Sequence, residues 1–218
     1  MATPSQIVQQ IEATGVVAII RASSSGELID VVSALRDGGL TCIEVTMTTP
    51  DALEVIHAAR EKMGDSAAIG VGTVLDAETA RAAILAGAQF VVAPIFDPPT
   101  VALCKRYSVP VVPAGMTPTE MVHAWQAGAD FVKLFPASGG GAGLIRDLKG
   151  PLPQIKIIPT GGINLDNCAE FIKAGAAALG IGSALVTREA VKNKDFAGLR
   201  SAAAAWLQRV DQARASLK

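Results

Sequence analysis

A lysine lies inside one of the most apolar segments of this chain, between Val132 and Leu134, with a phenylalanine on either side of that trio. Lysine is rarely buried unless it is paired, because its ammonium group loses its hydration. Burial of a lysine favours the neutral amine, which can attack a carbonyl carbon and form a Schiff base. Lys133 is therefore the candidate nucleophile of this sequence. The alternative is a structural lysine held in the core by an ion pair.

A glutamate lies in a second apolar run, between Ile43 and Val45. Successive side chains of a strand point to opposite faces, so Glu44 shares a face with Thr46 and not with its two neighbours. A carboxyl group in apolar surroundings has a raised pKa and can transfer protons near neutral pH. We therefore expect Glu44 to meet Lys133 and to act as a general acid and base. The alternative is a counter-ion that only neutralises the lysine.

Two features could bind the anionic groups of a ligand. Arg21 ends the apolar run 16–21, and its planar guanidinium suits a carboxylate, although a surface ion pair is an equal alternative. Glycine-rich segments at 160–164 and 180–184 let backbone N–H groups approach a phosphate closely. Tight turns built with glycine are the alternative there. The candidate ligand-binding residues of these two segments are Thr160, Gly161, Gly162, Gly182 and Ser183.

The histidines argue against two other chemistries. His57 and His123 are the only two histidines, and both lie in segments with helical periodicity. They cannot build a histidine cluster for zinc, and they leave serine and cysteine without a partner for nucleophilic catalysis. We therefore expect no metal.

The elements that must position these residues repeat one pattern, in which a short apolar run is followed by a segment of helical period. The runs are residues 16–21, 42–47, 68–73, 90–94, 109–114, 131–136, 156–160 and 178–183. Strands without polar alternation are covered on both faces, which indicates a parallel sheet with helices outside. Eight such units predict an α/β fold of the (β/α)8 TIM-barrel type. An open doubly wound sheet is less suitable, because residues 21–25 lack a dinucleotide-binding glycine pattern.

The barrel prediction gives the candidate residues a common location. Active sites of this fold lie at the carboxyl ends of the strands, and phosphates bind after the seventh and eighth strands. Predicted strands end at Arg21, Thr73, Thr160 and Ser183. The two glycine-rich segments lie at the ends of the seventh and eighth predicted strands, where this fold binds phosphate. Residues 5–14 predict an additional N-terminal helix, and residues 196–217 predict a C-terminal one docked by Trp206. No linker interrupts residues 1–218, so we expect a single domain.

Composition excludes other partners. With 218 residues, 50% of them hydrophobic, the chain can bury a large core. Lysine and arginine number 19 against 20 acidic residues, so no basic field is available for nucleic acid or an anionic membrane. Cys42, Cys104 and Cys168 lie among apolar residues or in a helical pattern, which favours buried thiols in a reducing compartment, the cytoplasm. No run is apolar for long enough to span a membrane, and we expect a soluble protein that is not exported.

Taken together, the motifs resemble those of the 2-keto-3-deoxy-6-phosphogluconate (KDPG) and 4-hydroxy-2-oxoglutarate (KHG) aldolase family. The similarity rests on the segments IEVT (43–46), GVGTV (70–74), TPTE (117–120), KLFP (133–136), PTGGIN (159–164) and GSAL (182–185). The resemblance implies a pyruvate-forming aldolase in which Lys133 forms the Schiff base and Glu44 is the acid and base. It further implies that Thr73 contacts the pyruvyl group and that Gly161, Gly162 and Ser183 bind phosphate.

The sequence departs from the family pattern at three places. Many members have an arginine where this chain has Thr48, and members without it have an arginine ending the first strand, so the resemblance assigns the substrate carboxylate to Arg21. Ala114 adds a methyl group where the family has a Pro-Gly pair, which puts substrate preference in question. Residues 138–143 are unusually rich in glycine, and we interpret them as a loop near the substrate or its phosphate.

The resemblance implies reversible cleavage of KDPG into pyruvate and D-glyceraldehyde 3-phosphate without a cofactor, in a homotrimer. The galactonate epimer of that substrate (KDPGal) and unphosphorylated 4-hydroxy-2-oxoglutarate are alternatives within the same chemistry. Alternatives from other classes are a phosphosugar isomerase without covalent chemistry and a catalytically silent barrel that binds keto acids. The expected partner in each case is a small keto acid or sugar phosphate.

Overall fold

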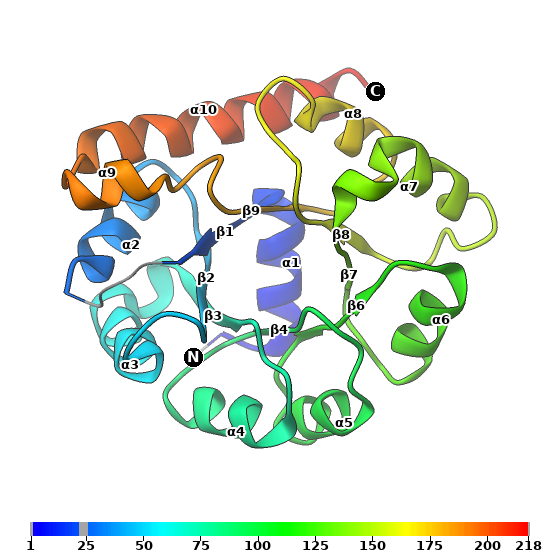
Figure 1. The fold of residues 1–218 in the computed structure, drawn as a ribbon, viewed down its shortest axis with the longest axis horizontal. Helices are drawn as coiled ribbons and strands as arrows, with labels where there is room; N and C mark the ends of the chain where they lie inside the picture. The colour runs from blue at the N-terminus through cyan, green and yellow to red at the C-terminus, as the bar shows by residue number, and fades with distance from the viewer. Residues whose placement is uncertain (1, 22–25, 218) are drawn as a thin grey trace.

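The strands form a ring that surrounds a central axis (Figure 1). The structure, a computed structural model, describes residues 2–21 and 26–217. Its strands are β1 (Val16–Ile20), β2 (Cys42–Thr46), β3 (Ala68–Gly72), β4 (Val91–Val92), β5 (Val111–Val112), β6 (Ala114–Gly115), β7 (Val132–Leu134), β8 (Ile157–Pro159) and β9 (Leu179–Ile181). The strands are shorter than the apolar runs that predict them, and the fifth predicted strand is divided into β5 and β6.

Parallel pairing closes this ring. β1 pairs with β2 on one side and with β9 on the other, so the first and last strands are neighbours. Pairing continues from β2 through β5 and, separately, from β6 through β8. The chain passes from β5 to β6 through Pro113, which has no N–H for the ladder, and Thr160 forms a parallel bridge with Gly180 of β9. The closed barrel is therefore confirmed, and the open sheet is excluded.

Helices cover the outside of the ring, as the repeated strand and helix pattern predicts (Figure 1). They are α2 (Leu28–Asp37), α3 (Ala52–Met63), α4 (Ala77–Leu85), α5 (Pro98–Arg106), α6 (Pro118–Gln126), α7 (Gly141–Lys149), α8 (Cys168–Lys173), α9 (Arg188–Lys192) and α10 (Phe196–Ala215). The predicted C-terminal helix is α10, which packs against α2 and α8 and buries Trp206. No helix among the described residues combines the length and the apolar character that crossing a bilayer would require.

Side chains of the strands alternate between two cores. Val17 and Cys42 belong to the cluster inside the barrel, whereas their neighbours Ala18 and Ile43 belong to the cluster beneath the outer helices. The predicted N-terminal helix is α1 (Pro4–Thr14), which crosses the barrel axis and contributes Ile7 and Ile11 to the inner cluster. Because α1 closes one end of the barrel, a ligand must enter from the other end, where the strands finish.

One segment differs from its predicted structure. Residues 138–143 are not a simple loop, because Ala137–Gly139 forms a 3-10 turn and α7 begins at Gly141. Glycine disfavours helix, but α7 buries Ile145 and Leu148, and the packing of that apolar face outweighs the local preference. The expected buried thiols are confirmed for all three cysteines, which are free and buried.

Candidate active site

Strand register places Lys133 and Glu44 inside the barrel. Glu44 of β2 lies opposite Ile19 of β1, and Lys133 of β7 lies opposite Ala114 of β6. Their exposed fractions are only 2% and 7%. Both line a small cavity of about 10 Å³ together with Thr160, and the rest of its lining is apolar apart from Gly180. The cavity is about the size of one water molecule. The two ionisable side chains thus meet in a space that excludes bulk solvent.

The lysine and the glutamate do not form a direct ion pair. Within residues 2–21 and 26–217, no carboxylate oxygen lies within 4.0 Å of the Lys133 Nζ. The Nζ instead lies 4.9 Å from the centre of the Phe135 ring. The sequence allowed a structural lysine held in the core by an ion pair, but the described residues do not contain such a pair. The amine is buried, and no carboxylate of the described part of the chain is in direct contact with it.

Burial dominates the electrostatics of Glu44. Desolvation raises the pKa of its carboxyl group, and the positive charges of Lys133 and Arg21 lower it in part. The charged form is disfavoured because water cannot reach the oxygens. A carboxyl group in this environment can hold a proton at a pH where an exposed glutamate has lost it, and it can still release that proton to a base.

Two glycines make room for these polar groups against the barrel wall. A Cβ atom at Gly72 of β3 would overlap the carboxylate of Glu44. A Cβ atom at Gly180 would likewise collide with the hydroxyl of Thr160. Gly72 lies in the GVGTV segment but is not a predicted site residue. The register of β2 and β3 pairs Gly72 with Thr46 and Gly70 with Glu44, and the Glu44 side chain extends along the barrel wall to Gly72. Both positions therefore require glycine for close approach.

Thr73 directly follows β3, next to Gly72. Its φ of 60° lies in the left-handed region, which a β-branched residue rarely adopts. Thr73 is half-buried and lines neither the interior cavity nor the larger pocket described next. It is the one predicted site residue that the structure leaves outside both spaces.

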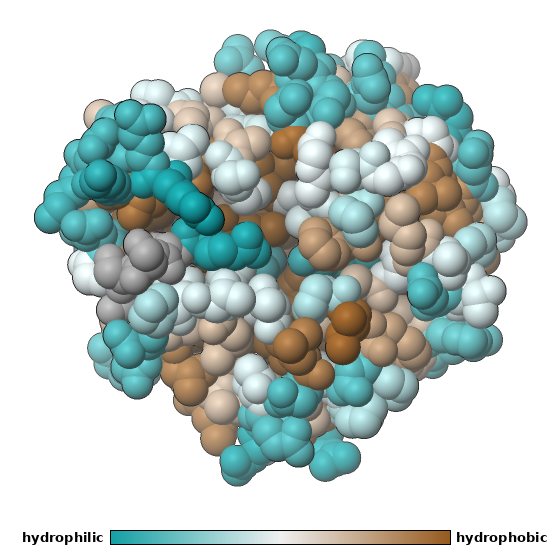
Figure 2. All heavy atoms as spheres, in the orientation of Figure 1, coloured by the Kyte–Doolittle hydropathy of each residue, from teal (hydrophilic) through white to brown (hydrophobic). Residues whose placement is uncertain are grey.

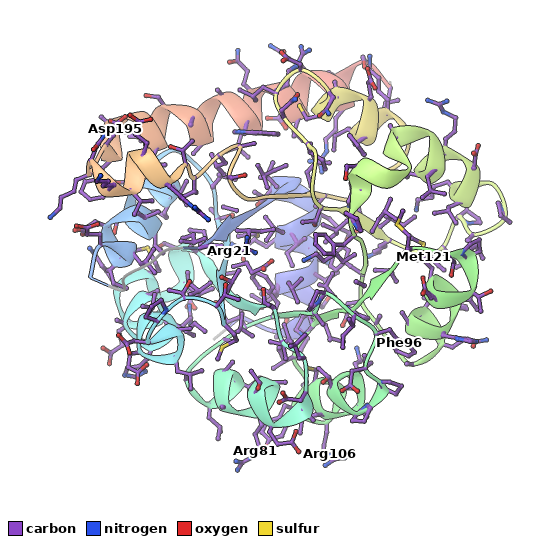
Figure 3. The ribbon with its side chains drawn as sticks, in the orientation of Figure 1. Arg21, Arg81, Phe96, Arg106, Met121 and Asp195 are labelled. Carbon is purple, nitrogen blue, oxygen red and sulfur yellow. The ribbon has the colours of Figure 1, made fainter. Side chains whose placement is uncertain are left out.

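A larger pocket of about 430 Å³ opens at the carboxyl ends of β1, β8 and β9. Its described lining includes Arg21, Thr160, Gly161, Gly162, Gly182 and Ser183, which are all of the predicted ligand-binding residues except Thr73. Figure 3 labels Arg21 near the barrel axis, and Figure 2 shows hydrophilic residues beside the hollow at the centre of this face. We call this space the mouth pocket. Thr160 and Gly180 line both the mouth pocket and the interior cavity and so connect them.

The glycine-rich loop after β8 has a defined conformation. Gly161 and Gly162 have φ values of 92° and 76°, which favour glycine. The Asn167 side chain donates a hydrogen bond of 3.0 Å to the Gly162 carbonyl and accepts one of 2.9 Å from the Asn164 N–H. A Cβ atom at Gly162 would press against Ser138, so the turn before α7 lies beside this loop. The predicted loop at 138–143 is wrong in its structure, but its first residues lie next to the pocket.

The sequence did not predict one charged residue of the mouth pocket. Arg188 lines it, and so do the apolar side chains of Ile19 and Phe135. A usable signal existed, because Arg188 follows the eighth predicted strand by only a few residues, where barrel loops bind ligands. The described lining contains two arginines and no acidic residue. This pocket is therefore suited to a ligand that carries negative charge.

Comparison with known proteins shows the family to which this chain belongs. A model of the KDPG and KHG aldolase family matches residues 7–201. The chain belongs to this aldolase family. It is an aldolase, and therefore a lyase. The 2-dehydro-3-deoxy-phosphogluconate aldolase of Treponema pallidum is 35% identical over 203 residues, which are 93% of this chain and 96% of that protein.

Two further relatives bear on this aldolase. The 2-dehydro-3-deoxy-6-phosphogalactonate aldolase of Escherichia coli is 35% identical over 170 residues, covering 78% of this chain and 83% of the other. The crystal structure of the KDPG aldolase from Legionella pneumophila, with pyruvate captured as a covalent carbinolamine, superposes with a TM-score of 0.86 at 28% identity. That comparison covers 92% of this chain and 97% of the other.

The family departures have definite places in the aldolase structure. Ala114 is buried and pairs with Lys133 across β6 and β7, so its methyl group lies next to the lysine strand. Thr48 is exposed, and its hydroxyl lies 2.9 Å from that of Thr46.

The described residues of this aldolase contain no group of three or more histidine, cysteine, aspartate or glutamate side chains that could hold a metal ion.

Proposed function

We propose that this aldolase reversibly cleaves KDPG to pyruvate and D-glyceraldehyde 3-phosphate through a Schiff base on Lys133. One observation carries the proposal. A buried lysine that forms no ion pair with any described residue shares a cavity with Glu44, and Thr160 connects that cavity to a pocket whose described lining includes Arg21 and Arg188. A lysine nucleophile, a nearby proton carrier and an anion pocket are what this reaction requires. The Treponema and Legionella relatives, both aldolases of this phosphogluconate, support the same substrate.

The Lys133 amine begins the reaction by attacking the C2 carbonyl carbon of the keto acid. The carbinolamine then loses water and becomes an iminium ion, which accepts the electron pair of the C3–C4 bond when that bond breaks. Glu44 takes the proton of the C4 hydroxyl, so the first product leaves as an aldehyde. The remaining enamine takes a proton at C3, and water hydrolyses the resulting iminium to release pyruvate and the free lysine.

The anchors of the mouth pocket fix the bond that breaks. Arg21 binds the substrate carboxylate. Thr73, which follows β3 outside the lining of this pocket, contacts the pyruvyl group. Thr160, Gly161, Gly162, Gly182 and Ser183 bind the phosphate end through backbone N–H groups and hydroxyls. Holding both ends places C2 beside the Lys133 amine and C4 beside Glu44. Much of the entropic cost of aligning the reacting groups is then met when the substrate binds.

A borohydride trapping experiment tests the covalent mechanism. Pyruvate and sodium borohydride are added to the folded protein, and intact mass and peptide mapping follow. The expected result is a gain of about 72 Da on Lys133, the mass of a reduced lysine and pyruvate imine. The absence of this adduct at several pH values would instead support a phosphosugar isomerase or a silent keto acid-binding barrel. Assays with KDPG, KDPGal and 4-hydroxy-2-oxoglutarate then rank the substrates.

Replacing Arg21 with glutamine is expected to raise KM for the keto acid about 10- to 100-fold, because the substrate carboxylate loses a charge-assisted pair. The positive charge of Arg21 lowers the pKa of Glu44, so the variant should also move the acidic limb of the kcat profile to higher pH. Steady-state kinetics over a pH series measures both effects. The control is Arg106→Gln, since Arg106 lies far from the barrel axis (Figure 3). An unchanged KM would remove Arg21 from the carboxylate site.

The assembly and location also belong to this proposal. We propose a homotrimer in the cytoplasm, where a reducing environment keeps Cys42, Cys104 and Cys168 as free thiols. The family resemblance supports the trimer, and the free, buried cysteines support the reducing compartment. Light scattering of the purified protein measures the number of subunits.

A further inference from the structure

Arg188 occupies a well-defined position beside the mouth pocket. It is the first residue of α9, and the preceding Thr187 caps this helix by accepting a 3.0 Å hydrogen bond from the Ala190 N–H. The chain between β9 and Thr187 includes Ser183, so Arg188 and Ser183 reach the pocket from the same connection. Arg21 reaches the pocket from β1, on a separate segment of the chain.

Within residues 2–21 and 26–217, no protein group pairs with the charge of Arg188. Among the residues that the structure describes, it forms no ion pair and no hydrogen bond through its guanidinium. Other cations do have partners, such as Lys156 with Glu12 at 2.9 Å and Lys194 with Glu27 at 3.3 Å. An exposed arginine that lines a pocket without an acidic residue is available to an anionic ligand.

The neutral groups of the pocket can bind a phosphate, but they carry no formal positive charge to pair with it. Backbone N–H groups at Gly161 and Gly162 and the Ser183 hydroxyl can bind a phosphate, a hydroxyl group or water. A guanidinium differs, because its planar fork forms charge-assisted hydrogen bonds to phosphate that a hydroxyl cannot match. The pocket also offers two cations for the two anionic ends of one substrate.

We propose that Arg188 binds the phosphate end of the substrate and makes this enzyme selective for phosphorylated sugar acids. This inference rests on the proposed aldolase function, and it names the substrate class within it. Arg21 takes the carboxylate next to the reacting carbonyl, and Arg188 takes the distal phosphate. Arg188 is a specificity-determining residue, and it takes no part in proton transfer or in bond cleavage.

The test compares KDPG with the same sugar acid lacking its phosphate, 2-keto-3-deoxygluconate. Replacing Arg188 with glutamine is expected to lower kcat/KM about 10- to 100-fold for KDPG and less than about twofold for the unphosphorylated acid. Arg188→Lys, which keeps the charge and loses the fork, should fall between the two enzymes. Lys192→Gln is the matched control, because it removes an exposed cation from the same helix at a position that does not line the pocket.

Calorimetry with inorganic phosphate as the probe adds a readout that needs no turnover. The wild-type protein should bind phosphate at least about tenfold more tightly than Arg188→Gln, with Lys192→Gln equal to wild type. Equal losses of kcat/KM on both substrates, or no loss on either, would overturn the assignment of Arg188. Trapping with pyruvate and borohydride separates the two proposals. Without an adduct on wild-type Lys133, the proposed function fails while the phosphate measurement still decides Arg188.

Discussion

Replacing Lys133 with alanine is expected to reduce kcat for aldol cleavage by at least about four orders of magnitude, to the background of the assay. The iminium ion that accepts the C3–C4 electron pair cannot form without the amine. The side chain lies in the interior cavity and forms no ion pair among the described residues, so its removal leaves no buried carboxylate without a contact partner. The barrel should therefore keep its fold, and circular dichroism checks that.

Lys156→Ala is the matched control for this experiment. Lys156 precedes β8 and pairs with Glu12 of α1 at the closed end of the barrel, away from the mouth pocket. Its loss should leave kcat within about twofold of wild type, since exposed ion pairs contribute little. If Lys133→Ala kept full turnover, or if the pyruvate adduct appeared on another lysine, the Schiff-base mechanism would have to be assigned elsewhere.

Glu44→Gln is expected to have the second largest effect, a loss of about 10²- to 10⁴-fold in kcat with little change in KM. The glutamine keeps the size and polarity of the side chain but cannot accept the C4 proton. In the wild-type enzyme, Glu44 must be ionised to act as that base, so kcat should rise with pH through its raised pKa. This limb should be absent in the variant. Glu54→Gln, on the exposed surface of α3, serves as the control.

Stability should respond to Glu44 with a defined sign. At a pH below the ordinary glutamate pKa, both the folded and the unfolded chains hold the proton, and the residue contributes no pH dependence. As pH rises to the higher pKa of the folded state, the unfolded chain loses its proton first, so the free energy of unfolding falls. The loss is complete once the folded pKa is passed. Denaturation at low and neutral pH should show that Glu44→Gln lacks this decline.

If Glu44→Gln retained wild-type kcat with an unchanged pH profile, the carboxyl group would be only a distant counter-charge to Lys133. If the variant lost activity and was also less stable than wild type at neutral pH, the effect would be structural. The mechanism predicts the opposite combination, with activity lost and stability kept or increased. A group that is costly to the fold and necessary to the reaction is typical of active sites.

Much of the site was predictable from local sequence, because its charged residues interrupt segments that are otherwise apolar. Lys133 interrupts an apolar strand, and the alternation of β2 puts Glu44 on the inner face. Both side chains lie on the interior cavity. The glycine-rich segments after the seventh and eighth predicted strands do line one pocket with Arg21. Those predictions depend only on residue type, spacing and strand order.

Other features depend on contacts between segments that are distant in the sequence. The fifth predicted strand is divided at Pro113. The carbonyl group of Pro113 accepts a hydrogen bond of 2.8 Å from the N–H of Lys133, which lies far away in the sequence. The helix at Gly141 depends on a place in the core for its apolar face. Local preference is too weak to decide either outcome, because tertiary packing contributes more than propensity to a short helix or strand.

Local periodicity and composition are enough to predict the barrel class, the buried lysine and glutamate, and the glycine-rich loops. How these parts meet depends on packing between distant segments. Closure of the ring between β1 and β9 brings Arg21 beside Ser183, and the orientation of α9 turns Arg188 into the same pocket. The direction of the Glu44 side chain brings its carboxylate against Gly72, which the register pairs with Thr46. A side chain's direction relative to a distant segment is set by three-dimensional packing, which no local pattern encodes.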